Sequence, residues 1–143
     1  MNAAVLDTCV TFKWFHHLDE EDVDVALLLR DAWLGGALEI TVPDLLVYEL
    51  ANTFRYKEPL KPIEADAAMS GFWSLGIQIH PVDETLARSA IQLAHKFDIS
   101  AYDAAFLALA AELSVPLFTA DRTLHKKAGK GHPVILLAEM TGL

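Results

Sequence analysis

Short apolar segments alternate with helical stretches along nearly the whole chain, and no other feature constrains the fold as strongly. Five segments have the length and apolar content of buried strands, at 3–6, 40–42, 77–80, 116–119 and 134–136. Between them, apolar spacing and capping residues predict helices at about 7–17, 25–34, 45–56, 62–75, 84–97, 100–113 and 121–127. Short strands that are apolar on both faces and joined through helices are typical of a parallel sheet covered on both sides. The sequence therefore predicts a three-layer α/β/α domain with a short central parallel β-sheet.

Length and composition indicate one folding unit. The chain has 143 residues with no internal repeat or Gly/Ser-rich linker, so we expect a single domain spanning 1–143. Hydrophobic residues make up 53% of the chain, yet no apolar run approaches the roughly 18–20 residues that a membrane span needs. The surplus therefore belongs in a core or a subunit interface. The absence of a basic-then-apolar leader and the single cysteine, Cys9, favour a cytoplasmic protein.

Carboxylates gather where the predicted strands end. Asp7 follows the first strand, and Asp121 lies just past the strand that ends at Thr119. Asp103 occupies the first turn of the helix at 100–113. In open parallel sheets, ligands bind beyond the carboxyl ends of the strands, at the point where the strand order reverses. These three side chains are therefore expected at one edge of the sheet.

A fourth carboxylate, Glu49, lies within the helix at 45–56. If Leu46, Leu50 and Phe54 form the inward row of this helix, Glu49 and Asn52 share a neighbouring face. Both side chains can then point together toward a site at the sheet edge.

Each carboxylate also has a purely structural explanation. Asp7 and Asp121 stand at helix starts and are plausible N-caps, while Ser100 and Asp103 form a pattern similar to a capping box. Glu49 is compatible with a solvated helix surface. Several carboxylates at one sheet edge would repel one another, however, and a bound cation removes that conflict.

Oxygen donors of this kind favour magnesium, with manganese as a plausible substitute. Zinc is disfavoured because the six histidines show no paired metal-ligand spacing.

Four fragments of the sequence resemble the PIN-domain ribonucleases, and specifically the VapC-like toxins of type II toxin–antitoxin (VapBC) modules. They are VLDTCV at 5–10 followed by KWF at 13–15, PDLLVYELAN at 43–52, SAYDA at 100–104, and FTADR at 118–122. The fragments occur in the right order and at suitable spacing over nearly the full length.

The resemblance implies a catalytic quartet of Asp7, Glu49, Asp103 and Asp121, with Asp7, Asp103 and Asp121 as the metal ligands. It also implies Thr119 as a polar neighbour of the metal and Asn52 as a supporting polar residue. The activity implied is magnesium-dependent hydrolysis of an RNA phosphodiester by a metal-activated water, leaving a 3′-hydroxyl and a 5′-phosphate. One departure from the pattern is Cys9, where many relatives carry Ser or Asn. Since a thiol is a poor magnesium ligand, a small packed hydrophobe is expected there.

A net charge of −9 argues at first against an RNA ligand, but the charge is segregated. Five of the twenty acids lie within 19–24, where they are expected to complement the start of a helix. Four basic residues cluster near the C-terminus and are candidates for RNA-backbone contacts, although a solvated helix end explains them equally well: Arg122, Lys126, Lys127 and Lys130. Lys13 is a weaker candidate for such a contact.

VapC-like toxins usually form homodimers and are inhibited by a cognate VapB-like antitoxin that covers the acidic pocket. The resemblance implies both partners for this chain, and the surplus apolar content is compatible with them. Aromatic residues that could serve these surfaces, although a core position is the simpler expectation for each, are Trp33, Phe54, Tyr56, Phe72 and Trp73.

Two other functions remain open at this point. A PIN-like RNA-binding module without catalysis would keep the same fold. An aspartyl-phosphate phosphatase or receiver domain would also place acids at strand ends beside magnesium. The phosphatase pattern has a second aspartate two positions after its nucleophile, and Cys9 occupies that position after Asp7.

Overall fold

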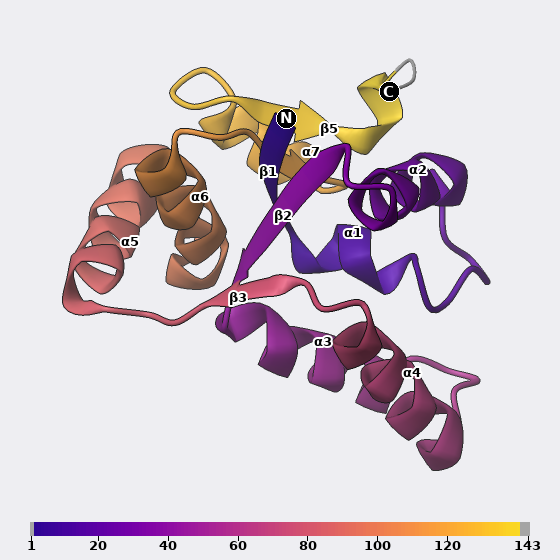
Figure 1. Cartoon of the computed structure of the whole chain (residues 1–143). Coiled ribbons are helices and arrows are strands. Elements are labelled where there is room, and N and C mark those ends of the chain that lie inside the picture. The colour runs from indigo at the N-terminus through magenta and orange to yellow at the C-terminus, as the bar shows by residue number, and fades with distance from the viewer. Residues whose placement is uncertain (1, 141–143) are drawn as a thin grey trace.

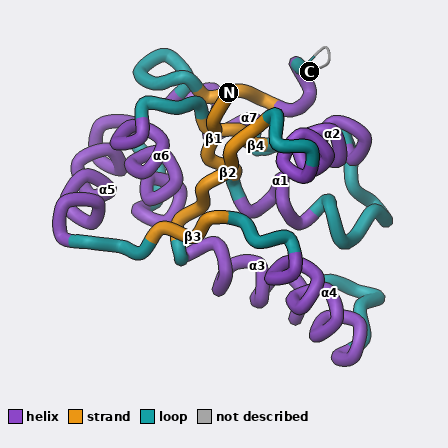
Figure 2. The backbone as a smooth tube through the Cα atoms, viewed as in Figure 1, coloured by secondary structure: helices purple, strands orange, loops and turns teal. Residues whose placement is uncertain are grey.

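Five parallel strands form the centre of the molecule. The computed structural model describes residues 2–140 and orders the strands β3-β2-β1-β4-β5 (Figures 1 and 2). Their bounds are β1 Asn2–Leu6, β2 Leu38–Pro43, β3 Gln78–His80, β4 Leu117–Thr119 and β5 Val134–Leu136. All four neighbouring pairs run parallel. The predicted parallel sheet is confirmed.

Helices lie on both sides of this sheet. Figure 1 shows α5 and α6 on one side of the central strands and α1 and α2 on the other, which is the predicted three-layer arrangement. The helices are α1 Thr8–Phe12, α2 Val23–Leu34, α3 Leu45–Tyr56, α4 Pro62–Ser74, α5 Glu84–Phe97, α6 Ala101–Leu113 and α7 Arg122–Ala128. A 3-10 turn, Leu137–Glu139, follows β5.

The strand order reverses beside β1. The chain proceeds from β1 to β2 and β3 in one direction, then crosses to β4 on the opposite side of β1. Asp7 follows β1 and Asp121 lies just beyond β4, so both carboxylates emerge at the carboxyl ends of the two strands that flank the reversal. This position is where α/β sheets bind ligands.

The core explains the orientation of α3. Leu46, Leu50 and Phe54 are buried on the predicted inward row, which leaves Glu49 on the neighbouring face. Asp44 is the N-cap residue of this helix, but its carboxylate accepts no hydrogen bond from the first turn. It accepts one from the backbone N–H of Val82 at 3.3 Å instead.

The first helix is shorter than the sequence predicts. It ends at Phe12 rather than near His17. The backbone N–H groups of Lys13, Trp14 and Phe15 bond three residues back, which tightens the chain into turns beyond the helix. The indole N–H of Trp14 donates to the carbonyl of Ala26 at 2.7 Å, so tertiary contacts hold this segment.

The acidic stretch at 19–24 mostly precedes α2 instead of lying in its first turn. Only Asp24 occupies that turn, because the helix begins at Val23. The expectation that these acids complement the helix start therefore holds for Asp24 alone, while Glu20 forms ion pairs with Lys13 and Lys57.

The fourth helix runs unbroken through Gly71, from Pro62 to Ser74. A Cβ at this position would lie 3.2 Å from the Phe15 ring, so the glycine permits close packing against the segment after α1. Gly76, at φ +66°, lies just beyond the helix C-cap, where a left-handed conformation favours glycine. Within residues 2–140, no helix has the length and apolar character needed to cross a membrane.

Candidate active site

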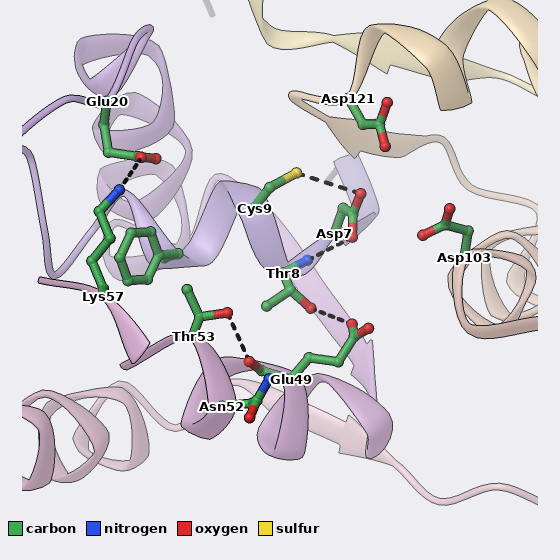
Figure 3. A pocket seen from close by; sticks show the side chains of 11 residues that line it. Asp7, Thr8, Cys9, Glu20, Glu49, Asn52, Thr53, Lys57, Asp103 and Asp121 are labelled. Carbon is green, nitrogen blue, oxygen red and sulfur yellow. Dashed lines mark hydrogen bonds and ion pairs between the residues drawn. The ribbon is translucent and has the colours of Figure 1, made fainter. Parts of the chain in front are cut away.

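A pocket of about 450 Å³ opens at the carboxyl end of β1 and contains all four predicted carboxylates (Figure 3). They reach it from four separate segments: Asp7 from the β1–α1 junction, Glu49 from α3, Asp103 from α6 and Asp121 from the start of α7. The remaining lining residues are Thr8, Cys9, Phe12, Glu20, Asn52, Thr53 and Lys57. The structure thus brings the four acids and Asn52 to one place.

Asp7 is the most buried of the four acids, with 7% of its surface exposed. Its Oδ1 accepts a hydrogen bond from the backbone N–H of Thr8 at 2.8 Å, and its Oδ2 accepts one from the Thr119 hydroxyl at 2.8 Å. It is therefore the N-cap of α1, as the structural explanation proposed, and also a wall of the pocket.

Burial raises the pKa of Asp7 from 3.8 to about 6. The hydrogen bonds from Thr119 and Cys9 oppose this rise, and the charge of Asp103 adds to it. A group in this state loses its proton most readily when a cation compensates the charge.

Glu49 and Asp103 are half-buried in the same pocket. Burial raises the pKa of Glu49, and the charge of Asp103 raises it further, while the Thr8 hydroxyl donates to Glu49 Oε1 at 2.8 Å. Burial likewise raises the pKa of Asp103, with the charge of Asp121 as the next cause. The four carboxylates therefore interact electrostatically as one group.

Asp121 combines capping with a place in the pocket. Its Oδ1 accepts hydrogen bonds from the backbone N–H groups of Thr123 and Leu124 at 2.8 and 3.1 Å, which caps α7. Its own backbone N–H donates to the Thr119 hydroxyl at 3.0 Å. For Asp121, as for Asp7, the capping role holds the carboxylate in the pocket and the two explanations are compatible.

Thr119 connects two of the acids. Its hydroxyl is fully buried, donates to Asp7 and accepts from the backbone of Asp121. Sequence reasoning selected this residue as a polar neighbour of the site, and the structure places it behind the pocket rather than among the lining residues.

Replacing Thr119 by valine is expected to lower the free energy of unfolding by about 1–3 kcal/mol, because Asp7 Oδ2 and the backbone N–H of Asp121 each lose a hydrogen bond while the side-chain shape is kept. Urea unfolding at pH 7 measures this change. Thr41→Val is the matched control, since the Thr41 hydroxyl bonds only to the exposed Gln78 side chain at 3.1 Å. Equal effects of the two substitutions would show that the Thr119 contacts carry no special weight.

The pocket offers the donor set of a hard cation. Its candidate ligands are carboxylate oxygens, and no histidine is among its lining residues. Within residues 2–140, no three His, Cys, Asp or Glu side chains converge closely enough to coordinate one ion directly. Magnesium keeps several of its waters and needs only one or two direct carboxylates, so the residues present fit a hydrated ion.

Cys9 makes polar contacts that the sequence did not suggest. Its sulfur lies 3.4 Å from Asp7 Oδ2 and accepts a hydrogen bond from the backbone N–H of Ala120 at 3.3 Å. Burial raises the pKa of the thiol far above its usual range, and the charge of Asp7 adds to this, so the S–H proton stays available to Asp7. Cys9 packs against the core as expected, and its sulfur in addition contacts the Asp7 carboxylate.

The predicted basic cluster lies outside the pocket. Arg122, Lys126 and Lys130 are exposed on α7 and just beyond it, and Lys127 pairs with Asp98 at 3.5 Å. Lys13 is the clearest departure from expectation. It is buried, with its ammonium 3.2 Å from Glu20 Oε1, and has no surface to offer to a phosphate.

Sequence reasoning missed five lining residues: Thr8, Phe12, Glu20, Thr53 and Lys57. The position of Thr8 next to Asp7 was the one available signal. Glu20 and Lys57 lie in irregular segments whose placement depends on tertiary packing, and no local pattern marks them.

The five aromatic candidates for partner surfaces divide between core and surface. Phe54 and Phe72 are buried in the core and Trp33 is partly buried. Tyr56 and Trp73 are exposed at 70% and 57%, so a core position is wrong for these two residues.

The PIN domain model matches residues 4–130 of the chain. Ribonuclease VapC3 of Pyrobaculum aerophilum is 33% identical over 99 residues, which make up 66% of this chain and 75% of that protein. Among solved structures, FitAcB from Neisseria gonorrhoeae has a TM-score of 0.70 at 21% identity and covers 96% of this chain and 99% of its own. A toxin–antitoxin complex from Klebsiella pneumoniae has a TM-score of 0.68 at 17% identity, with coverages of 96% and 99%.

The structural matches establish the shared fold. The two sequence matches, to the family model and to the Pyrobaculum protein, establish the family. The family model spans most of the chain and includes all four pocket carboxylates. On this basis the chain belongs to the PIN domain family and is one of its VapC-like members.

Proposed function

We propose that this protein is a magnesium-dependent endoribonuclease and acts as the toxin of a VapBC-type toxin–antitoxin pair. One observation carries the proposal: carboxylates from four separate segments line a single pocket at the point where the strand order reverses. Three of them have raised pKa values in the absence of a cation. Burial is the main cause of each rise, and the charge of a neighbouring carboxylate adds to it. Carboxylates perturbed in this way inside a pocket are typical of a functional site.

Each carboxylate has a role in the proposed reaction. Asp7, Asp103 and Asp121 would hold the magnesium ion, for which manganese is a plausible substitute, directly or through its waters. When bound, the ion would lower the pKa of a coordinated water and would neutralise charge on the phosphodiester during in-line displacement. Glu49, which accepts a hydrogen bond from the Thr8 hydroxyl, would accept the proton of the attacking water. Asp103 would take this role where it does not bind the ion. Asn52 lines the same pocket and would be a supporting polar neighbour of these groups.

The proposed substrate is RNA because the similar Pyrobaculum protein is named a ribonuclease. Arg122, Lys126, Lys127 and Lys130 would contact the RNA backbone farther from the cleaved bond. These residues lie on or next to α7, the helix that Asp121 caps, so the same short segment connects the acidic pocket to basic surface.

We also propose a VapB-like antitoxin and a second copy of the chain as partners. A solved neighbour of similar fold is a toxin–antitoxin complex. The chain exposes several large apolar side chains on neighbouring helices, among them Tyr48, Tyr56 and Trp73. Burial of such side chains against protein partners would remove apolar surface from water.

The two other functions fit the pocket less well. In an aspartyl-phosphate enzyme Asp7 would be the nucleophile, yet both its oxygens accept hydrogen bonds and little of the side chain is exposed. An inactive binding module would not need four interacting carboxylates in one pocket, three of them with raised pKa values.

The test is cleavage of single-stranded RNA by purified protein with magnesium, with manganese and with EDTA. Cleavage is expected only with a metal, and the products should carry 5′-phosphates and 3′-hydroxyls because water is the nucleophile. Mass spectrometry of the product ends distinguishes these from cyclic phosphates. Metal binding without cleavage of any RNA would favour the inactive module, and cleavage that persists in EDTA would contradict the mechanism.

A further inference from the structure

One wall of the pocket carries positive charge. Lys57 follows the last residue of α3, and Glu20 lies in the loop before α2, yet their side chains meet at the pocket with Nζ 3.4 Å from Oε2. Figure 3 shows this pair across the pocket from Asp103 and Asp121, and the Phe12 ring lies next to Lys57. The Lys57 ammonium lies 5.7 Å from the centre of that ring, which favours a cation at this place.

Glu20 does not neutralise Lys57, because it is shared with a second lysine. Lys13 Nζ contacts Glu20 Oε1 at 3.2 Å, and Lys57 Nζ contacts the other oxygen. The Lys13 side chain is only 7% exposed, so its charge depends on Glu20 for compensation. One carboxylate between two ammonium groups leaves a net charge of one positive unit. Lys57 presents this charge to the pocket, because its side chain is 28% exposed.

Lys57 is the one lysine or arginine among the eleven lining residues found in the described part of the chain. The four exposed basic residues near the C-terminus do not line the pocket. An RNA strand entering this acidic pocket therefore meets one cationic side chain directly, and that side chain has three N–H donors, of which Glu20 takes one.

We propose that Lys57 binds a backbone phosphate of the RNA strand next to the phosphate that is cleaved, and that Lys13 and Glu20 position it. This assignment rests on the proposed ribonuclease function and adds a substrate-binding residue outside the acidic quartet. The Lys13–Glu20 pair acts as a buried anchor: Glu20 orients the Lys57 ammonium, and Lys13 supplies the charge that keeps Glu20 from cancelling it.

Lys57→Gln is expected to raise KM for a single-stranded RNA about tenfold while kcat changes less, since a charged phosphate contact is lost and the carboxylates are untouched. The slope of log KM against log salt should fall by about 0.7, the value for one phosphate contact on a single strand. Lys57→Arg should restore most of the affinity. Lys96→Gln, which removes an exposed lysine on α5 that does not line the pocket, is the matched control.

Lys13→Met tests whether the buried Lys13–Glu20 pair positions Lys57, because Lys13 itself makes no direct contact with RNA. Lys13 is buried and cannot reach RNA, but its removal leaves Glu20 to pair fully with Lys57. KM is therefore expected to rise in this variant also, by a smaller factor than in Lys57→Gln. Thermal unfolding of each variant checks that the fold is kept.

Binding is measured independently of cleavage by fluorescence anisotropy of labelled RNA with Asp103→Asn protein, with and without Lys57→Gln. If wild-type protein does not cleave RNA but Lys57→Gln still weakens binding, the proposed function fails while the role of Lys57 stands. Values of KM, Kd and salt slope that match those of Lys96→Gln would overturn the role of Lys57. A fall in kcat alone would overturn it too, because it would place Lys57 with the catalytic acids instead.

Discussion

Asp7→Asn is expected to lower the rate of RNA cleavage in magnesium by about 10³-fold or more. The asparagine amide keeps the size of the side chain but removes the charge that would hold the cation against the end of β1. Loss of about 4 kcal/mol of transition-state stabilisation corresponds to a factor of this size. Single-turnover cleavage of a labelled RNA, with saturating enzyme, measures the change without a contribution from product release.

A matched control is Asp66→Asn, which changes the same functional group on the exposed surface of α4. It should leave the cleavage rate as in wild type. Calorimetric titration with magnesium should show weakened binding for Asp7→Asn alone. Wild-type cleavage rates in purified Asp7→Asn protein would refute the assignment of this pocket as the site of catalysis.

Asp7→Asn is also expected to stabilise the metal-free protein at neutral pH. The pKa of Asp7 is raised from 3.8 to about 6, so the folded state retains a proton that the unfolded chain has lost. The stability that the protonated Asp7 carboxyl contributes to the folded state is therefore fully present below pH 3.8 and is lost as pH rises through about 6. This difference between the pKa values of Asp7 in the unfolded and folded states corresponds to about 3 kcal/mol. The raised pKa values of Glu49 and Asp103 act in the same direction.

Urea unfolding in EDTA between pH 4 and 7.5 tests this expectation. The difference in unfolding free energy between Asp7→Asn and wild type should be small at the acidic end and approach about 3 kcal/mol at pH 7.5. Magnesium at about one hundred times its Kd should restore about 2.7 kcal/mol to wild type and little to the variant. A difference that does not change with pH would mean that Asp7 is not held at a raised pKa.

Local sequence patterns were sufficient for the fold. Each strand of the sheet is short and apolar, and each intervening helix has its own apolar spacing, so both kinds of element are encoded within about a dozen residues. The parallel connection then follows from the alternation itself. The same logic predicted the meeting of Asp7 and Asp121, because residues that follow neighbouring parallel strands must emerge at one edge.

The local sequence around Glu49 and Asp103 was not enough to predict that they belong to the site. Periodicity placed Glu49 beside the inward row of α3, but that face becomes part of a pocket only when α3 packs against α1 and Asp103 reaches the same place from α6. The family resemblance supplied what the helix pattern could not. The capping explanations for Asp7 and Asp121 were not alternatives to a site, since the same hydrogen bonds hold both carboxylates in position.

What the sequence alone determined is therefore the order of elements, the parallel sheet and the gathering of acids at its edge. Tertiary structure alone decided which other charged side chains lie near those acids. Lys13 is spaced like a surface residue but is buried against Glu20, and Lys57 enters the pocket because the chain after α3 meets the loop before α2. Ion pairs between irregular segments depend on how distant parts of the chain pack, and no local period records that.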